Sequence, residues 1–144
     1  MYLNKIERNN NKGFTLIELL VVLSIIGLLA GLVGPQVMKH LGGSKVKAAK
    51  VQIQDLAAAL DMYKLDVGTY PSTSEGLNAL VENPGQIGGW NGPYLRKKAV
   101  PKDPWNREYV YKFPGEHGDF DIYSLGADGS EGGEGENLDQ GSWQ

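Results

Sequence analysis

The chain has 144 residues, enough for one compact domain with an appended segment, and its 41% hydrophobic content argues against wholesale disorder and against several membrane spans. All 14 Lys and Arg residues lie before residue 115, whereas residues 115–144 carry eight acidic residues. Because nucleic-acid-binding proteins usually present a basic face, this charge distribution argues against a nucleic-acid partner. The sequence has no Cys, which excludes disulfides and thiolate metal sites.

Residues 14–33 form an apolar run in which Glu18 is the only charged residue. A helix of this length is about 30 Å long, the thickness of the hydrocarbon core of a bilayer. Lys5, Arg8 and Lys12 precede the run, so we expect the N-terminus to stay in the cytoplasm and the bulk of the chain to lie across the membrane.

An ordinary signal peptide or signal anchor is the alternative interpretation of this run. The residues that follow it, Gly34-Pro35-Gln36-Val37-Met38, do not form the small-residue cleavage site of a signal peptide. A carboxylate deep in hydrocarbon costs about 2.5–3.5 kcal/mol on insertion scales. Glu18 is therefore a candidate functional residue that needs a partner.

A helical pattern resumes after the apolar run and continues to residue 67. Apolar residues recur at alternating spacings of three and four, which places them on one helix face: Val46, Ala49, Ile53, Leu56, Leu60, Tyr63 and Val67. Gly68 is a natural stop. We therefore predict a near-continuous helix over residues 14–67, with a kink or local melting at Gly34-Pro35 and a second weak point at Gly42-Gly43.

Residues 68–144 predict a small α+β head built on the apolar stripe of that helix. Capping residues at 72–75 precede Leu77, Leu80 and Val81 and predict a short second helix. Alternating residues predict strands over 108–113 and 120–125, and the six residues between them predict a hairpin. The predicted fold class is thus α+β, a long N-terminal α-helix followed by a small C-terminal antiparallel β-sheet head.

The last twenty residues are rich in Gly and acids, and a disordered acidic tail is one interpretation of them. Trp143 argues against it, because a large aromatic side chain needs a surface to pack on. Clustered carboxylates and backbone carbonyls on a Gly-rich loop are hard oxygen ligands that suit Ca²⁺. Zn²⁺ is disfavoured, since His40 and His117 are far apart in the sequence, and the spacing of the acids does not match an EF-hand.

The order of Lys12, Gly13, Phe14 and Glu18 resembles the N-terminal signal of the type IV pilin class. The resemblance implies cleavage between Gly13 and Phe14 by a prepilin peptidase, methylation of the new amine of Phe14, and retention of the apolar helix. Pairing of that amine with Glu18 of a neighbouring copy would offset the cost of burying each charge. We hypothesise that this pairing fixes the stagger between assembling copies.

Four further stretches, residues 65–71, 75–77, 101–105 and 124–129, resemble the major pseudopilins of type II secretion, the G subunits. The resemblance extends from Lys12 to Trp143. It implies the pilin fold and one structural Ca²⁺ per subunit in the C-terminal loop, with the ligands Asp128, Asp139, the backbone oxygen of Leu125, Ser130 and Asn137. Residues 134–140 depart from the usual family pattern, so the ligands in the second half of the loop stay open.

The resemblance also implies a division of the chain into four parts: a cleaved cytoplasmic leader (1–13), a transmembrane and assembly helix (14–34), its amphipathic continuation (35–67) and a periplasmic head (68–144). The implied function is that of a single-pass inner-membrane protein whose copies polymerise into a periplasmic filament, the pseudopilus, that drives folded exoproteins through the outer-membrane secretin. Implied partners are further copies of the chain, minor pseudopilins, the inner-membrane assembly platform, the prepilin peptidase, the secretin and the exported proteins.

Two other functions are alternatives. One is a surface type IV pilin for adhesion, motility or DNA uptake, although such pilins commonly close a C-terminal loop with a disulfide that this chain cannot form. The other is a membrane-anchored periplasmic enzyme. No Ser/His/Asp or Cys/His arrangement stands out, and His117 falls in the predicted hairpin loop, so we expect no catalytic residues and no enzymatic activity.

Overall fold

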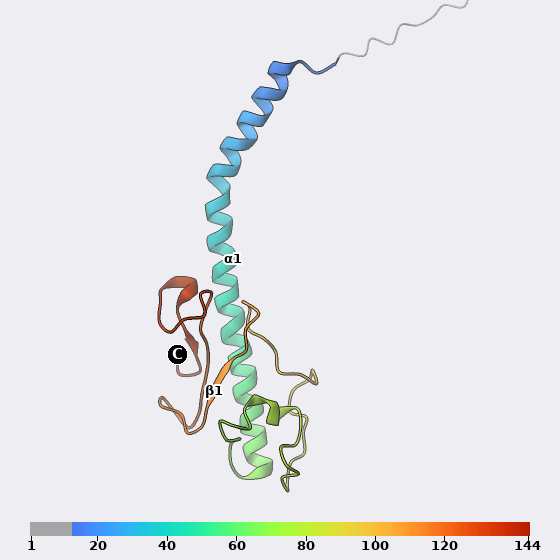
Figure 1. Cartoon of the computed structure of the whole chain (residues 1–144), viewed down its shortest axis with the longest axis vertical. Helices are drawn as coiled ribbons and strands as arrows, with labels where there is room; N and C mark the ends of the chain where they lie inside the picture. The colour runs from blue at the N-terminus through green and yellow to red at the C-terminus, as the bar shows by residue number, and fades with distance from the viewer. Residues whose placement is uncertain (1–12) are drawn as a thin grey trace, which may run out of the picture. The chain divides into compact units, whose positions relative to one another are not determined.

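Figure 1 shows the computed structural model of the chain, which describes residues 13–144. The basic residues Lys5, Arg8 and Lys12 and most of the predicted leader lie outside the described residues. The described chain divides into two compact units, one ending at Met38 and one covering Lys39–Gln144, which we call the head. Helix α1 (Leu16–Val67) contributes its first part to the N-terminal unit and its second part to the head.

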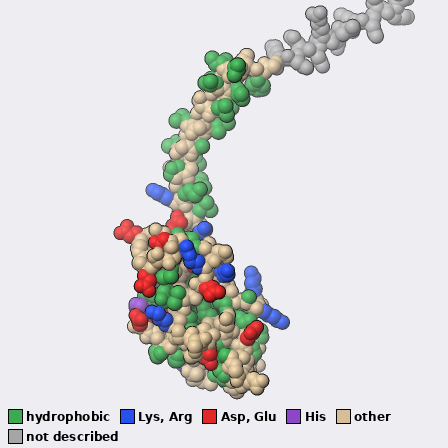
Figure 2. All heavy atoms as spheres, in the orientation of Figure 1, with side chains coloured by type: hydrophobic (Ala, Val, Ile, Leu, Met, Phe, Trp, Pro, Cys, Tyr) green, Lys and Arg blue, Asp and Glu red, His purple; other side chains and the backbone are tan. Residues whose placement is uncertain are grey.

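The N-terminal unit is a helix with its apolar side chains exposed. The most apolar 18-residue window of α1 has a mean hydropathy of 2.7 and no buried residue, so by length and composition the helix suffices to cross a membrane. Figure 2 shows hydrophobic side chains along this segment. The expected local melting at Gly34-Pro35 does not occur, because Pro35 lies inside the continuous helix α1. A proline removes one hydrogen bond of the ladder, and the flanking bonds maintain the helix.

The head is built on the second part of α1, as the apolar stripe predicts. Ala49, Ile53, Leu56, Leu60 and Tyr63 are all buried, whereas large residues on the opposite face, such as Met62 and Leu65, are exposed. The rest of the core consists of residues that pack onto this stripe: Tyr70, Leu77, Ala79, Leu80, Tyr109, Tyr111 and Ile122. The predicted helix stripe is therefore the floor of the hydrophobic core.

The predicted short second helix is a single 3₁₀ turn, η1 (Leu77–Leu80). The capping residues do bond to each other: Ser72 N donates to Glu75 Oε2 over 2.7 Å, and Glu75 N donates to Ser72 Oγ over 3.2 Å. However, Gly76 follows them with a φ of 63°, a left-handed conformation that interrupts a regular helix. The turn therefore begins only after Gly76.

The sheet has three antiparallel strands in the order β1-β2-β3. The predicted hairpin is confirmed by β1 (Val110–Lys112) and β2 (Asp121–Ser124), both shorter than expected, with Tyr111 opposite Ile122. The third strand, β3 (Gln140–Gly141), was not predicted. It pairs with the other edge of β2 and so fixes the C-terminal end of the chain to the sheet.

Candidate functional site

The predicted processing junction lies just before helix α1. Gly13 and Phe14 are exposed and non-helical, and the side chain of Phe14 is 86% exposed. A Cβ added at Gly13 would meet no atom within 4 Å. Cleavage by a peptidase needs an accessible segment, and Gly13 and Phe14 are accessible.

Glu18 forms a capping box at the start of α1, an interaction that was not predicted from the sequence. Its Oε2 accepts a hydrogen bond from Thr15 N over 2.9 Å, and its backbone N donates to Thr15 Oγ1 over 3.3 Å. This reciprocal pair satisfies two of the N–H groups that a helix start leaves without partners. The Thr-x-x-Glu pattern of residues 15–18 was the sequence signal for it.

The C-terminal loop, which we define as residues 125–139, is folded back on itself. Ala127 N donates to Glu136 O over 2.9 Å, and Gly126 lies against the backbone of Asn137. The loop contains the short 3₁₀ turn η2 (Gly135–Asn137). Leu125 and Asp128, at the start of the loop, are thus brought to the same region as Asn137, as a shared ligand site requires.

The two predicted carboxylate ligands each make one local hydrogen bond. Asp128 Oδ1 accepts from Ser130 N over 3.0 Å, and Asp139 Oδ2 accepts from Gly132 N over 2.9 Å. The other oxygen of Asp139, Oδ1, is buried without a hydrogen-bond partner among the described atoms. Within residues 13–144, no three His, Asp or Glu side chains converge as they would at a carboxylate-rich metal site. A cation here would need backbone carbonyls to complete its shell.

A turn over residues 103–107, which was not predicted from the sequence, supports the C-terminal loop. Asp103 is only 4% exposed, and its carboxylate accepts bonds from Trp105 N, Arg107 N and Ser124 Oγ. Arg107 Nη1 donates to Gly126 O over 2.7 Å and to Ala127 O over 3.0 Å. The Asp103-Pro104 dipeptide was the available sequence signal for a tight turn.

The end of the chain is held by an aromatic stack on the hairpin loop. The rings of His117 and Trp143 stack with centroids 4.0 Å apart, and His117 Nδ1 lies 3.0 Å from Asp121 Oδ2. Burial alone would raise the pKa of Asp121, but the hydrogen bonds from the His117 ring and from the backbone N–H groups of Glu116 and His117 outweigh it, so this pKa is lowered. Trp143 therefore packs on the hairpin loop, which argues against the disordered-tail interpretation.

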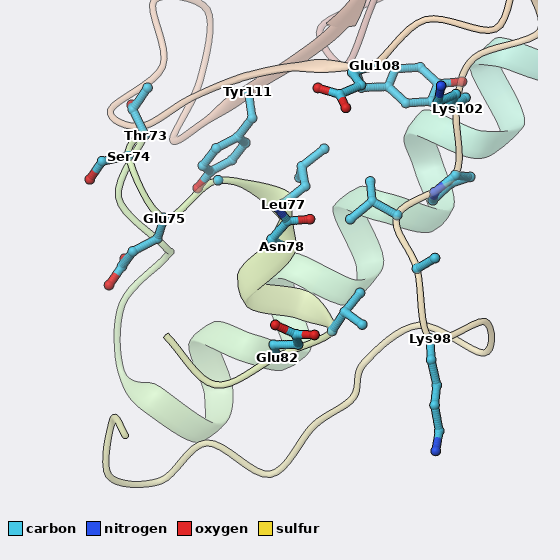
Figure 3. Close-up of a pocket in the computed structure, with 16 residues that line it drawn as sticks. Thr73, Ser74, Glu75, Leu77, Asn78, Glu82, Lys98, Lys102, Glu108 and Tyr111 are labelled. Atoms are coloured by element: carbon cyan, nitrogen blue, oxygen red, sulfur yellow. The ribbon is translucent and has the colours of Figure 1, made fainter. Parts of the chain in front are cut away.

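One hollow in the head carries no recognisable catalytic arrangement. It is a cavity of about 590 Å³ between η1 and residues 98–102, and its rim mixes acids with bases, among them Glu75, Glu82, Glu108, Lys98 and Lys102 (Figure 3). His117, the one described His in the head outside helix α1, stacks on Trp143 rather than facing a nucleophile. The hollow does not strengthen the enzyme alternative.

An exposed apolar helix with an acid in the capping box of its first turn, joined to a small α+β head with an antiparallel sheet, defines the type IV pilin-like class. Residues 8–34 match the family described as prokaryotic N-terminal methylation motif, and residues 36–143 match the family described as type II secretion system (T2SS), protein G. The chain belongs to this protein G family of the type II secretion system.

Individual relatives agree with this assignment. The chain is 52% identical over 141 residues to the type II secretion system core protein G of Pseudomonas aeruginosa, covering 95% of this chain and 98% of that protein. It is 45% identical to the core protein G of Vibrio cholerae, covering 91% of this chain and 90% of that protein. The crystal structure of the major pseudopilin from enterohaemorrhagic Escherichia coli matches with a TM-score of 0.61 and 35% identity, covering 74% of this chain and 92% of that one.

These comparisons confirm the predicted resemblance and the α+β pilin fold class, and they favour a pseudopilin over a surface pilin. The protein G family consists of structural subunits, which agrees with the expectation that the chain is not an enzyme. The boundaries at residues 13, 34 and 67, the ligands and the role of Glu18 stay predictions.

Proposed function

We propose that this chain is the major structural subunit of the pseudopilus of type II secretion, which polymerises from the inner membrane into the periplasm and drives folded exoproteins through the outer-membrane secretin. The observation that carries the proposal is the apolar window of α1, which has no buried residue, in a chain of the protein G family. Such a surface needs lipid before assembly and the helices of other copies afterwards.

The energetics of this helix explain why assembly needs a specific device. Burying a Leu, Ile or Val side chain away from water stabilises by about 1.5–3 kcal/mol, and the window presents many such residues. A helix in the membrane already has this hydrophobic stabilisation, because lipid is as apolar as a neighbouring helix. Moving the helix from lipid into a filament therefore adds little hydrophobic stabilisation. Helix packing, polar pairing and work done by the assembly platform must therefore drive the transfer from lipid to filament.

Glu18 is the residue suited to polar pairing. In the single chain its carboxylate caps its own helix through Thr15 N, but cleavage after Gly13 creates a cationic amine at Phe14, four residues away. An adjacent copy would present the same amine to the carboxylate of Glu18. One pairing per subunit gives a constant offset between copies, which a filament requires.

Two substitutions separate the assembly role of Glu18 from its capping role. Glu18→Ala removes the charge and the cap, whereas Glu18→Gln keeps the cap, because Gln also fits the capping box. We expect both variants to insert and to be cleaved normally but to form no filaments, as judged by electron microscopy of cells with a complete secretion apparatus. Glu82→Ala, which removes an exposed acid in the head, is the matched control and should assemble. Normal filaments from Glu18→Gln would refute charge pairing.

The C-terminal loop suits one structural Ca²⁺ per subunit. The supporting observation is Asp139 Oδ1, a buried carboxylate oxygen with no partner among the described atoms, which is an expensive arrangement unless a cation satisfies it. Asp128, Asp139 and the backbone oxygen of Leu125 are the ligands that we propose, with Ser130 and Asn137 as further candidates. The ion would join the two halves of a loop that has few apolar contacts.

Calcium removal tests this part of the proposal. Chelation should lower the melting temperature of the head, and Asp128→Ala should abolish the difference between calcium and chelator. The three Trp residues, 90, 105 and 143, all lie in the head, so Trp fluorescence of the full chain in detergent reports on the head alone. A melting temperature that changes neither with chelator nor with the substitution would refute the calcium site. It would not bear on the polymerisation proposal.

The proposed partners follow from the proposed assembly. The prepilin peptidase removes residues 1–13 and methylates Phe14, the inner-membrane platform extracts the helix from lipid, and minor pseudopilins join the filament. The secretin and the exported proteins meet it in the periplasm. Before assembly the chain is a single-pass inner-membrane protein, with the head on the periplasmic side.

A further inference from the structure

The backbone of Arg107 is held by the turn over residues 103–107, which fixes the point from which its side chain extends. Asp103 N donates to Arg107 O over 2.8 Å, and Arg107 N donates to Asp103 Oδ1 over the same distance. Ser124 Oγ donates to the other oxygen of Asp103 over 2.6 Å, which ties the turn to strand β2. Because Asp103 is almost fully buried, this turn is a rigid base for the guanidinium.

The guanidinium of Arg107 is directed at the first half of the C-terminal loop. Its Nη1 donates to the carbonyl oxygens of Gly126 and Ala127. It also fills the space beside Gly129, where an added Cβ would lie 2.8 Å from Cζ and Nε of Arg107. The three residues contacted, Gly126, Ala127 and Gly129, surround Asp128, the first proposed calcium ligand.

Gly126 and Gly129 both have left-handed backbones, with φ of 66° and 69°. Such positions cost little for Gly, but they leave the chain many alternative conformations when it is not held. The hydrogen bonds from Arg107 select one of them. A charged donor makes bonds about twice as strong as a neutral one, and a guanidinium holds its donors in a fixed plane.

We propose that Arg107 is a positioning residue of the calcium site: it binds the carbonyls of Gly126 and Ala127 and thereby presents Asp128 to the ion. The inference rests on the calcium part of the proposed function. A guanidinium and a calcium ion compete for carbonyl oxygens, so Arg107 holds the carbonyls of Gly126 and Ala127 and leaves the Leu125 carbonyl, which is not among its acceptors, free of the guanidinium. Arg107 does not touch the metal.

Calcium titration of the chelator-stripped full chain in detergent, by isothermal calorimetry, tests the proposal. Residues that orient metal ligands typically change metal affinity 10–100-fold when they are replaced. We expect Arg107→Gln to raise the Kd for Ca²⁺ by about that factor, and Arg107→Lys, which keeps the charge without the fork, to raise it less. Arg96→Gln removes an exposed Arg elsewhere in the head and is the matched control, with an unchanged Kd.

A second measurement separates positioning from general stabilisation. The melting temperature of each variant is recorded by Trp fluorescence with Ca²⁺ and with chelator. If Arg107 positions the site, Arg107→Gln reduces the increment that Ca²⁺ adds. An equal loss with and without Ca²⁺ would make its role purely structural and would overturn the proposal, as would a Kd that is unchanged or lower. If Arg107→Gln does not fold, the Kd of Arg107→Lys decides by the same criterion.

The outcomes also distinguish this inference from the proposed function. If the unmodified chain binds no Ca²⁺, the calcium site and the role of Arg107 are both wrong, while the filament proposal stands. If the unmodified chain binds Ca²⁺ and Arg107→Gln binds it equally well, only the role of Arg107 is wrong.

Discussion

Gly42 and Gly43 are adjacent in α1 and provide a sharp test of how the C-terminal loop packs on the helix. A Cβ added at Gly42 would overlap the carboxylate end of Glu136, whereas a Cβ added at Gly43 would meet nothing within 4 Å. Gly42 is buried and Gly43 is exposed. The side chain of Glu136 therefore lies across the one turn of the helix where a Gly leaves room for it.

The expected magnitudes follow from this difference. Replacing Gly by Ala inside a helix stabilises by about 1 kcal/mol. Gly43→Ala should gain that amount, which raises the melting temperature of a domain of this size by about 4 °C. Gly42→Ala makes the same helical gain but displaces Glu136, whose lost methylene contacts cost about 0.8 kcal/mol for each CH₂. We therefore expect Gly42→Ala to be close to neutral.

Thermal unfolding of the full chain in detergent, followed by Trp fluorescence, measures both variants alone and combined with Glu136→Ala. In the Glu136→Ala background, Gly42→Ala should give the full stability gain of about 1 kcal/mol. The gain from Gly43→Ala should be the same with and without Glu136→Ala. Equal effects of the two Gly substitutions in the original sequence would refute the packing of Glu136 on Gly42.

Two further predictions concern the core and the pH dependence of the head. Leu60 is fully buried, so Leu60→Ala should lower the free energy of unfolding by about 2–5 kcal/mol, whereas Leu65→Ala, at an exposed position, should change it by less than about 0.5 kcal/mol. Similar losses for both variants would contradict the assigned helix face. The lowered pKa of Asp121 means that its ionised form stabilises the head above the pKa of an unfolded Asp, about 3.9, and that this contribution is lost as the pH falls further. The difference in melting temperature between the original chain and Asp121→Asn should therefore shrink from pH 6 to pH 3, and a constant difference would show that the charge of Asp121 is not involved.

The parts of the fold that the sequence predicted are those with a strong repeating pattern. The stripe from Val46 to Val67 identified the buried face of α1, because burial on one helix face imposes a 3–4 spacing. Alternation identified the hairpin strands. Both signals depend only on neighbours along the chain, so they survive without knowledge of the tertiary structure.

The features that the sequence did not predict depend on contacts between distant residues. Strand β3 has two residues, too few for any alternation, and it is defined by its pairing with Tyr123 and Ser124 of strand β2. The hydrogen bonds of Arg107 go to carbonyls some twenty residues away. Gly42 was expected to be a weak point of the helix, but the structure shows a contact position for Glu136. Every residue has a backbone carbonyl, so the residue types do not reveal which carbonyls accept hydrogen bonds. The conformation of such a loop is therefore difficult to predict from the sequence.

The proposed function requires that this chain, cut after Gly13, is the repeating unit of a filament. Mass spectrometry of filaments isolated from cells with an active type II secretion apparatus tests it directly. We predict that the main component is this chain beginning at Phe14, thirteen residues shorter than the full sequence and carrying one methyl group. Recovery of the chain only with residues 1–13 attached, or only as dispersed single molecules while secretion proceeds normally, would contradict the account.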